Sequence, residues 1–516
     1  MRSIILVTLI FLAAMHCATD VGAADRTARL ISNLDHPLWT ARRDAALRIA
    51  ESKDSSGTAV PALIRALTDV SVEVRRASVQ ALAAVGPGSE QAVAGLVTAL
   101  GDEDWVVRRQ AALSFQALQP TSSTAVPAIR RVLSSESTDI RTAAALALSG
   151  LAPASAQALP ELETALASDN WQLRAAAAHA IGSLGEDASV ALPALAHALR
   201  DRDWGVTEQV IESLSRIGKP ALPILIEALQ DDNLIASWGA TRALGYIGSD
   251  AIDAVPALAG VLKHESLQVR WAGARSLWAI GPVAAEATPY LVESLTDKEW
   301  VVRWAAARAI GAVASEAHIA LTVPALANAL TDRDSRVCEA AAFALEQMGV
   351  VAEAALPALG QVVSAEQDSA ARTGTCQVID VGPAIDELLM QTGWTVRWAA
   401  ARALGVVGKG NQDALPPLTV ALLDEEWQVR GVAALAIGQF GIASTSAARS
   451  ALADTLQDEN AAVRKAAAIA LGEIGGPARS SIASLLVAEG DDNAAVRESA
   501  AEAIGKILDG QKGELK

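Results

Sequence analysis

The chain has 516 residues, 51% of them hydrophobic, and a formal net charge of −17 from 42 basic and 59 acidic side chains. This acidic balance excludes a general nucleic-acid-binding protein, which presents a basic surface to phosphates, and the apolar fraction excludes an intrinsically disordered chain. Length alone suggests about three or four domains. Tryptophan is unusually frequent, with 12 Trp against 4 Phe and 2 Tyr.

Residues 1–23 are predicted to be a secretory signal peptide. Arg2 precedes an apolar run at residues 4–14, and small residues surround the cleavage site expected after Ala23; this order is typical of such peptides. The run is too short to span a bilayer, which takes about 20 apolar residues. We therefore expect an exported protein, periplasmic or secreted, with no membrane span after cleavage.

The cysteine and histidine content argues against a metal site. Only Cys338 and Cys376 follow the signal peptide; in an exported chain they can pair, but two cysteines are no disulfide framework. The five histidines that follow the signal peptide are dispersed, so they supply no zinc ligand set. The sequence predicts no metal and no cofactor.

One phrase, exemplified by Trp105-Val106-Val107-Arg108, recurs along the rest of the chain. When its Arg is taken as slot 0, most successive slots lie 33 residues apart. The slot-0 residues are Arg42, Arg75, Arg108, Arg141, Arg174, Thr207, Ser237, Arg270, Arg303, Cys338, Arg372, Arg397, Arg430, Arg464 and Arg497. This period predicts that residues 24–509 form an all-α solenoid, a superhelix of about fifteen two-helix repeats of about 33 residues. A polar C-terminal tail is expected at residues 510–516.

Each repeat carries signals for two helices. A Pro 14 positions before slot 0, as in Pro61, suits the first turn of the first helix. A Gly 11 positions after slot 0, as in Gly218 and Gly281, is expected to end the second helix in the left-handed conformation. An Asp 6 positions before slot 0, as in Asp69, is expected to cap that second helix. Both helices are predicted to have about 12 residues.

The slot-0 arginines are interpreted as structural. A guanidinium at this position can bond the carbonyls of its own turn or the Asp of a neighbouring repeat, and a row of such bonds makes a ladder. Thr207, Ser237 and Cys338 replace Arg and are expected to break that ladder.

One stretch departs from the period. Cys338 and Arg397 are 59 residues apart, which fits two repeats only if the second, from Arg372, is 25 residues long. Glycines interrupt the helical pattern between residues 360 and 396. We expect a shortened turn between helices here; a hinge in the solenoid is the alternative.

The repeat phrases resemble a known family. Val60-Pro61-Ala62-Leu63, the phrase that ends in Arg108, and the run at residues 403–408 are similar to short HEAT repeats of the phycobilisome-lyase-like type. The resemblance implies that second helices line a partner-binding face. That family includes scaffolds, adaptors, bilin lyases and deoxyhypusine hydroxylases. The hydroxylases use repeated His-Glu pairs to hold iron, and this chain has a single pair, His264-Glu265, so that activity is excluded.

The second helix has one apolar side and one side with unusual residues. Slots −1, +3, +7 and +10 are apolar, so slots +1, +5 and +8 are expected to point outward. In four repeats slot +1 is Trp and slot +5 is Arg, and Trp278 adds an indole at slot +8. We expect each Trp to stack on the Arg four residues later. The candidate partner-binding residues are Trp238, Arg242, Trp271, Arg275, Trp278, Trp304, Arg308, Trp398 and Arg402.

This outward stripe has two interpretations. The rings pack against adjacent repeats and stiffen the array, or they form a binding platform, because Trp and Arg dominate interface hot spots and guanidinium groups bind carboxylates or phosphates. The other seven Trp stand at slot −3, where a ring covers the turn, and are interpreted as structural. They are Trp39, Trp105, Trp171, Trp204, Trp300, Trp394 and Trp427.

No phosphate-binding loop, nucleophile elbow or paired-His helix occurs in the sequence. We therefore expect an exported, non-catalytic scaffold or adaptor that binds another protein. Binding of carbohydrate or of anions along the Trp/Arg stripe is the first alternative, since indoles stack on sugar rings. A bilin-lyase-like activity is the second, and it rests on the family resemblance alone.

Overall fold

The computed structural model describes residues 26–52, 57–86, 89–116, 122–364 and 393–514. Throughout these ranges the regular structure is helical, with no strand. The chain divides into two compact units, Met1–Ile247 and Gly248–Lys516, called unit 1 and unit 2 below. The predicted signal peptide, Arg372 and Cys376 lie outside the described residues.

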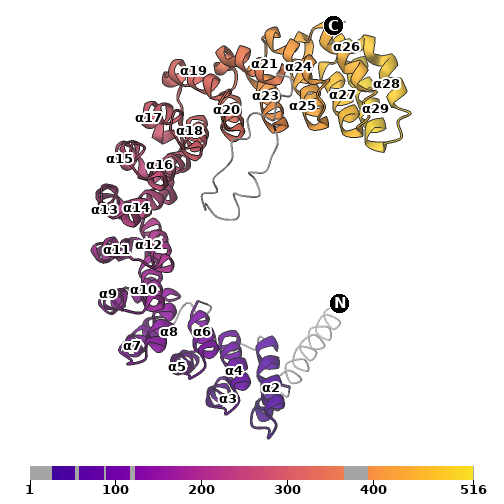
Figure 1. Ribbon diagram of the computed structural model, residues 1–516. Helices are drawn as coiled ribbons and strands as arrows, with labels where there is room; N and C mark the ends of the chain where they lie inside the picture. The colour runs from indigo at the N-terminus through magenta and orange to yellow at the C-terminus, as the bar shows by residue number, and fades with distance from the viewer. Residues whose placement is uncertain (1–25, 53–56, 87–88, 117–121, 365–392, 515–516) are drawn as a thin grey trace, which may run out of the picture. The chain divides into compact units, whose positions relative to one another are not determined.

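In both units a short first helix and a longer second helix alternate along the chain (Figure 1). The first helices of unit 1 are α3 (Val60–Ala66), α5 (Glu90–Ala99), α7 (Ser122–Leu133), α9 (Leu159–Leu166), α11 (Leu192–Ala198) and α13 (Leu222–Ala228). Its second helices are α2 (Trp39–Ser52), α4 (Val72–Val85), α6 (Trp105–Ser114), α8 (Thr138–Ser149), α10 (Trp171–Ser183), α12 (Trp204–Ile217) and α14 (Leu234–Ile247).

Unit 2 repeats the same alternation. Its first helices are α15 (Val255–Val261), α17 (Thr288–Ser294), α19 (Ile319–Ala329), α21 (Leu356–Ser364), α24 (Leu415–Ala421), α26 (Ser446–Thr455) and α28 (Ile482–Ala488). Its second helices are α16 (Leu267–Ile280), α18 (Trp300–Val313), α20 (Ser335–Met348), α23 (Trp394–Val407), α25 (Trp427–Gly438), α27 (Ala461–Ile474) and α29 (Ala494–Glu514).

Within each unit, every second helix packs on the second helix of the next repeat, and the first helices form the other layer (Figure 1). The slots predicted to be apolar face this interior: Val302, Ala306 and Ile310 of α18 are fully buried. Because a single helix pair leaves apolar side chains exposed, burial between neighbouring repeats supplies the core. The predicted all-α solenoid is confirmed.

Short 3₁₀ helices join most repeats, and they make the first helices shorter than the predicted 12 residues. In α11 a Pro occupies the first turn, as expected, directly after the 3₁₀ segment. The joining segments are η2 (Ala154–Ala158), η3 (Gly185–Ala191), η4 (Lys219–Ala221), η5 (Gly248–Ala254), η6 (Gly281–Ala287), η7 (Glu316–His318), η8 (Gly349–Ala355), η11 (Gln412–Ala414), η12 (Gly441–Ala443) and η13 (Gly476–Ser481).

The glycine that ends the second helix has a positive φ in several repeats, as predicted, but not in all: Gly86, which ends α4, has φ −103° and ψ 17°. Gly218 has φ 74° and ψ −135°, and Gly281 has φ 78° and ψ −150°. These angles lie in a region that essentially only glycine occupies, rather than in the left-handed helical region. The chain therefore turns into the next 3₁₀ segment without a left-handed helical cap.

The Asp six positions before slot 0 is not the helix cap that the sequence suggested. The Oδ1 of Asp102 accepts a hydrogen bond from the backbone N of Asp104 at 2.8 Å, which forms an Asx turn. Asp104, two residues later, is the N-cap of α6, and its carboxylate accepts from the backbone N of Val106 and Val107. The prediction placed the cap two residues too early because both positions are often acidic.

The irregular stretch falls inside one repeat. Helices α21 and α23, which flank residues 365–392, pack against each other as the first and second helix of a repeat, and α20 packs directly on α23. The slot 0 predicted at Arg372 lies outside the described residues, so the 25-residue repeat counted from it, and the choice between a shortened turn and a hinge, stay predictions. The described ranges hold fourteen second helices.

Two further features concern helix length. The helical run Ser335–Ser364 has 30 residues with a mean hydropathy of 1.3, long and apolar enough to cross a membrane. It is interrupted at Gly349, where φ is +64°, and α20 before this break has only 14 residues, about 21 Å. At the C-terminus α29 extends to Glu514, past the start of the tail expected at residue 510.

Candidate partner-binding surface

A ladder of Arg–Asp pairs joins successive repeats, as predicted. Arg303 donates from Nε and Nη2 to the carboxylate of Asp332 in the next repeat, at 2.7 and 2.8 Å. Its Nη1 donates to two carbonyls of its own turn, those of Asp297 and Lys298. The Arg303 side chain is 4% exposed. Each such Arg therefore fixes its own turn and holds the next repeat at the same time.

The same arrangement recurs in both units. The other pairs in which Arg bonds the Asp six positions before the next slot 0 are Arg42–Asp69, Arg75–Asp102, Arg174–Asp201, Arg270–Asp297, Arg397–Asp424, Arg430–Asp458 and Arg464–Asp491. Two guanidinium nitrogens approach the two oxygens of the carboxylate, which is the strong, geometrically specific form of the ion pair.

The ladder is interrupted where either partner is missing. Thr207 replaces Arg in unit 1, and Asp231 of the next repeat is bonded by Arg200 instead. Arg141 meets Ser168 where other repeats have Asp, and its buried Nε has no hydrogen-bond partner in the described structure. Cys338 is buried, and its Sγ donates to the carbonyl of Asp332.

Three of the four predicted Trp–Arg stacks are present. In unit 2 the guanidinium of Arg275 lies 5.0 Å from the ring centroid of Trp271, and that of Arg402 lies 5.3 Å from Trp398. The fourth prediction is wrong, since Arg308 lies over Trp278 of the preceding repeat, at 4.9 Å, rather than over Trp304. The ring of Trp278 reaches Arg308 because slots +8 and +5 of neighbouring second helices face each other.

Phe343 is a member of this surface that the sequence did not indicate. It stands at slot +5 of α20, where other repeats have Arg, and its ring lies 5.7 Å from the guanidinium of Arg308. On its other side it meets Trp398 edge-on at 6.0 Å and Arg402 at 5.3 Å. Since α20 packs directly on α23, Phe343 joins the two parts of the stripe. A search of slot +5 for aromatic residues, and not only for Arg, would have found it.

Carboxylates accompany two of these arginines. Arg402 donates from Nε to Glu346 of α20 at 2.8 Å. Burial lowers the pKa of Arg308, against the opposing effect of Glu339. Burial also raises the pKa of Glu339, which accepts a hydrogen bond from Thr395 and interacts with Arg308. The stripe in unit 2, defined as Trp271, Arg275, Trp278, Trp304, Arg308, Phe343, Trp398 and Arg402, is thus aromatic with much of its charge internally balanced.

Unit 1 contains the remaining predicted pair. The guanidinium of Arg242 lies 4.6 Å from the ring of Trp238 and 5.3 Å from that of Tyr246. It also forms an ion pair with Glu208 of the preceding second helix. Trp204, at slot −3 of that preceding helix, packs on Trp238 with ring centroids 5.0 Å apart. Arg242 is therefore a half-buried, charge-compensated part of an aromatic cluster.

The slot −3 tryptophans do contact the next repeat, as a structural role requires, yet several are more exposed than the stripe. The ring of Trp300 lies under the guanidinium of Arg336, and the ring of Trp171 lies close to the backbone of Gly205. Even so, Trp105 is 61% exposed and Trp204 60%, whereas Trp271, Trp304 and Trp398 are half-buried.

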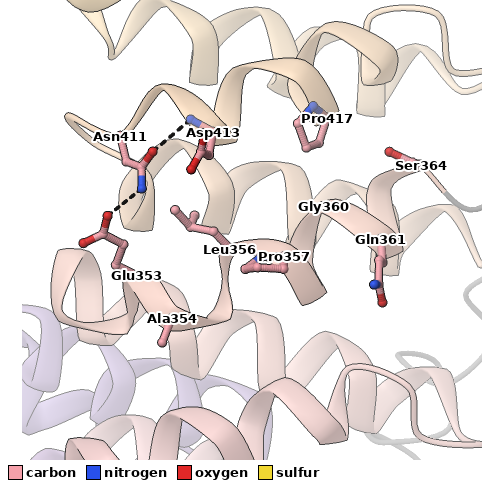
Figure 2. Close-up of a pocket in the computed structure, with 10 residues that line it drawn as sticks. All are labelled: Glu353, Ala354, Leu356, Pro357, Gly360, Gln361, Ser364, Asn411, Asp413 and Pro417. Atoms are coloured by element: carbon pink, nitrogen blue, oxygen red, sulfur yellow. Dashed lines mark hydrogen bonds between the residues drawn. The ribbon is translucent and has the colours of Figure 1, made fainter.

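One open cavity of about 660 Å³ lies in unit 2, between first helices α21 and α24, in the layer opposite the stripe (Figure 2). Pro357, Gly360 and Pro417 form its apolar floor. Asn411 donates from Nδ2 to Glu353 at 2.5 Å at its rim. No nucleophile and base converge there, so its lining suggests no chemistry. Among the described residues no group of three or more His, Cys, Asp or Glu is placed to hold a metal ion.

Fold and surface together define an α-solenoid of two-helix repeats. HEAT-repeat family models match residues 27–116, 93–182, 159–238, 226–311, 288–380, 383–457 and 450–514. The chain therefore belongs to the HEAT-repeat family. No curated protein matches the sequence.

Solved structures of a karyopherin share the fold. Kap121p matches over 93% of this chain at 14% identity and a TM-score of 0.63. Kap121p bound to Nup53p matches over 93% at 15% identity and 0.63, and Kap121p bound to RanGTP over 94% at 14% identity and 0.61. This chain spans 56% of the length of each of these structures. At such identity the likeness shows the fold alone.

Proposed function

We propose that this protein is an exported, non-catalytic scaffold or adaptor that binds another protein on the second-helix layer, through the stripe in unit 2. Export follows from the predicted signal peptide at residues 1–23. The phycobilisome-lyase-like subtype of HEAT repeat remains a prediction from the repeat phrases. Protein binding also agrees with the shared fold, since the structures it resembles include complexes of Kap121p with protein partners.

The continuity of the stripe is the observation that carries the proposal. Four successive second helices, α16, α18, α20 and α23, each contribute aromatic rings or guanidinium groups at slots +1, +5 and +8. The rings are half-buried by their neighbours, which fixes their orientation before a partner arrives. Rigid aromatic and Arg side chains of this kind supply most of the free energy at protein interfaces.

The charge of the stripe favours a protein over an anionic ligand. Arg402 is paired with Glu346, and Arg308 lies near Glu339, so each guanidinium already has a negative neighbour. An anion would have to compete with these carboxylates. Arg275 is the exception, since it is exposed and has no carboxylate within salt-bridge distance in the described part of unit 2. Nothing in the surface supports covalent transfer of a bilin.

Site-specific photo-crosslinking tests the proposal. A benzophenone amino acid in place of Arg275 puts the reactive group on the stripe, and the same group in place of Ile442 is the matched control. Ile442 is 83% exposed and lies in η12 of unit 2, outside the second-helix layer. After incubation with the native extracellular or periplasmic fraction, the stripe position is expected to capture one protein that the control position does not.

Equal capture at both positions, or none at position 275, would contradict protein binding by the stripe. The carbohydrate alternative is tested on the same protein by titrating Trp fluorescence with neutral polysaccharides. A saturable change that is lost in Trp271→Ala would favour that alternative over a protein partner.

A further inference from the structure

The edge of unit 1 where each second helix begins carries exposed indoles. Trp105 is 61% exposed, Trp171 45% and Trp204 60%, at the first residues of α6, α10 and α12. Because these rings are exposed, much of their apolar surface is in contact with water and does not contribute to packing within the fold. Gly205 lies against the ring of Trp171, where a Cβ would come within 3.1 Å, so the backbone itself holds this indole in place.

Acidic side chains at this edge fall into two sets. The Asp at slot −6 forms an ion pair with a ladder Arg; Asp102, for example, is paired with Arg75. The acid at slot −5 is exposed: Glu103 is 85% exposed although Arg75 touches it, and Glu136 and Asp169 are exposed with no cation within salt-bridge distance in the described part of unit 1. The first set holds the repeats together, while the second leaves negative charge beside the indoles.

We propose that this edge binds an extended, lysine- or arginine-rich peptide segment of a partner. The surface, called the turn edge below, is defined by Glu103, Trp105, Glu136, Asp169, Trp171, Trp204 and Asp232. Indole faces attract ammonium and guanidinium groups, and the slot −5 carboxylates pair with the same cations. The turn edge is separate from the stripe, since it lies at the start of the second helices and not along their outward face.

The spacing of the repeats sets the spacing of the ligand. Packed helices are about 8–10 Å apart, and an extended chain rises about 3.3 Å per residue. One repeat therefore matches about three residues of peptide. A cation at every third position meets one carboxylate or indole per repeat across α6, α8, α10 and α12, whose order is drawn in Figure 1. Arg202, at slot −5 of the repeat of Trp204, marks one place where a cation is unfavourable.

The test measures binding of fluorescein-labelled peptides to the full chain by fluorescence anisotropy. One peptide repeats Lys-Ser-Gly over about 15 residues, to span about five repeats; the second has the same composition with its lysines in one block; the third replaces Lys by Glu. The evenly spaced Lys peptide is expected to bind at least about fivefold more tightly than the block peptide, and more weakly as salt rises. The Glu peptide is expected not to bind.

Two double variants locate the site. Trp105→Ala/Trp171→Ala and Glu103→Gln/Asp169→Asn are each expected to weaken the evenly spaced Lys peptide about tenfold or more. The acid-to-amide variant keeps the side-chain volumes. It therefore still tests the turn edge if the Trp variant fails to fold. The matched controls, Val190→Ala and Glu186→Gln/Asp187→Asn, change exposed residues of η3 at the opposite edge and are expected to change affinity less than twofold.

Three results would overturn the proposal. They are equal affinity for the evenly spaced and block peptides, unchanged affinity in both turn-edge variants, and an equal loss in the η3 controls. Equal loss in the controls would show binding by net negative charge alone, because the chain carries −17 overall. A failure here leaves the stripe unaffected, since the variants of the two surfaces share no residue.

Discussion

Arginine serves two different purposes in neighbouring positions of the same helix. In α18, Arg303 at slot 0 is 4% exposed and donates to Asp332 and to two carbonyls of its own turn. Five residues later, Arg308 at slot +5 rests on aromatic rings, Trp278 and Phe343. The guanidinium of Arg303 uses its donors in bonds within the fold. The guanidinium of Arg308 has a face and donors that a partner can reach.

This contrast shows how a repeat array separates stability from binding. An Arg at slot 0 lies beside the carbonyls of its own turn and the Asp of the next repeat, which stand at fixed positions. An Arg at slot +5 contacts slot +1 of its own helix or slots +5 and +8 of a neighbouring second helix, so its partners vary: rings in one repeat, rings and a carboxylate in another. The role of an Arg in this chain therefore follows from its slot in the repeat and not from its residue type alone. Four predictions test this difference, and they are given from the largest effect to the smallest.

Acid should break the ladder at the pairs whose Asp has a lowered pKa. The hydrogen bonds from Arg464 hold the pKa of Asp491 below its ordinary value, and burial of Asp201 is outweighed by its bonds to Arg174, so the pKa of Asp201 is also lowered. A carboxylate whose pKa is depressed by folding stabilises the fold above its unfolded pKa of about 3.9 and loses this contribution as pH falls through the folded value.

The expected result is a free energy of unfolding that is nearly constant above about pH 5 and falls steeply below about pH 4. Urea unfolding at a series of pH values, followed by circular dichroism, measures it. Arg464→Met removes one lowered pKa and should flatten the curve. A free energy of unfolding that rises as pH falls would contradict the ladder as a source of stability.

Removing one ladder Arg should have the largest effect of any single substitution. Arg303→Ala leaves Asp332 nearly buried without its cation, which is expected to cost about 3 kcal/mol. The matched variant, Arg275→Ala on the stripe, should cost less than about 0.5 kcal/mol because its side chain is exposed. Denaturant unfolding of the two variants gives the comparison. Equal losses would mean that slots 0 and +5 do not differ in the way proposed.

Restoring a missing ladder partner should stabilise unit 1. Ser168→Asp keeps the side-chain oxygen that accepts from the backbone N of Asn170 and adds a carboxylate opposite Arg141, whose Nε is unpartnered. The expected gain is about 1 kcal/mol. Ser168→Asn is the control, since it keeps an acceptor for the turn without the charge. A gain in both variants would assign the effect to the turn rather than to the ion pair.

The last prediction concerns the effect of a stripe ring on stability, which is expected to be small. Trp398→Ala removes a half-buried ring that contacts Phe343 and Arg402, and is expected to cost about 1 kcal/mol, well below a ladder variant. Thermal unfolding followed by circular dichroism measures the change. A loss as large as that of Arg303→Ala would place the stripe among the structural elements.

Much of the fold follows from the sequence because the same local chemistry is repeated. The period, the Pro at the start of the first helix and the Gly after the second are signals confined to a few residues, and the buried slots follow from the helical period. The interval around Arg372 shows the limit of a period, which counts residues and contains no contacts. Arg372 lies outside the described residues, and the packing of α20 and of α21 on α23 could not be derived from the spacing.

The candidate surface was harder to predict because its contacts cross between repeats. A helical wheel places Trp304 and Arg308 together, but it contains no information on the second helix of the preceding repeat, from which Trp278 comes. The same limit hid Phe343, whose importance depends on lying between α18 and α23. A helical wheel also does not show which side chains lie beside the first residue of a helix, where the slot −3 rings stand. The exposure of Trp105 could therefore not be derived from it.

The most direct test of the central claim combines affinity and stability in one pair of proteins. Once crosslinking from position 275 has identified the partner, its dissociation constant and the free energy of unfolding are measured for the wild type and for Trp271→Ala/Trp304→Ala, with Ile442→Ala as control. The predicted result is a loss of affinity of about tenfold or more, while the variant stays folded and loses about 1 kcal/mol of unfolding free energy per indole. Unchanged affinity in a folded variant, or an equal loss of affinity in Ile442→Ala, would contradict a stripe built for binding.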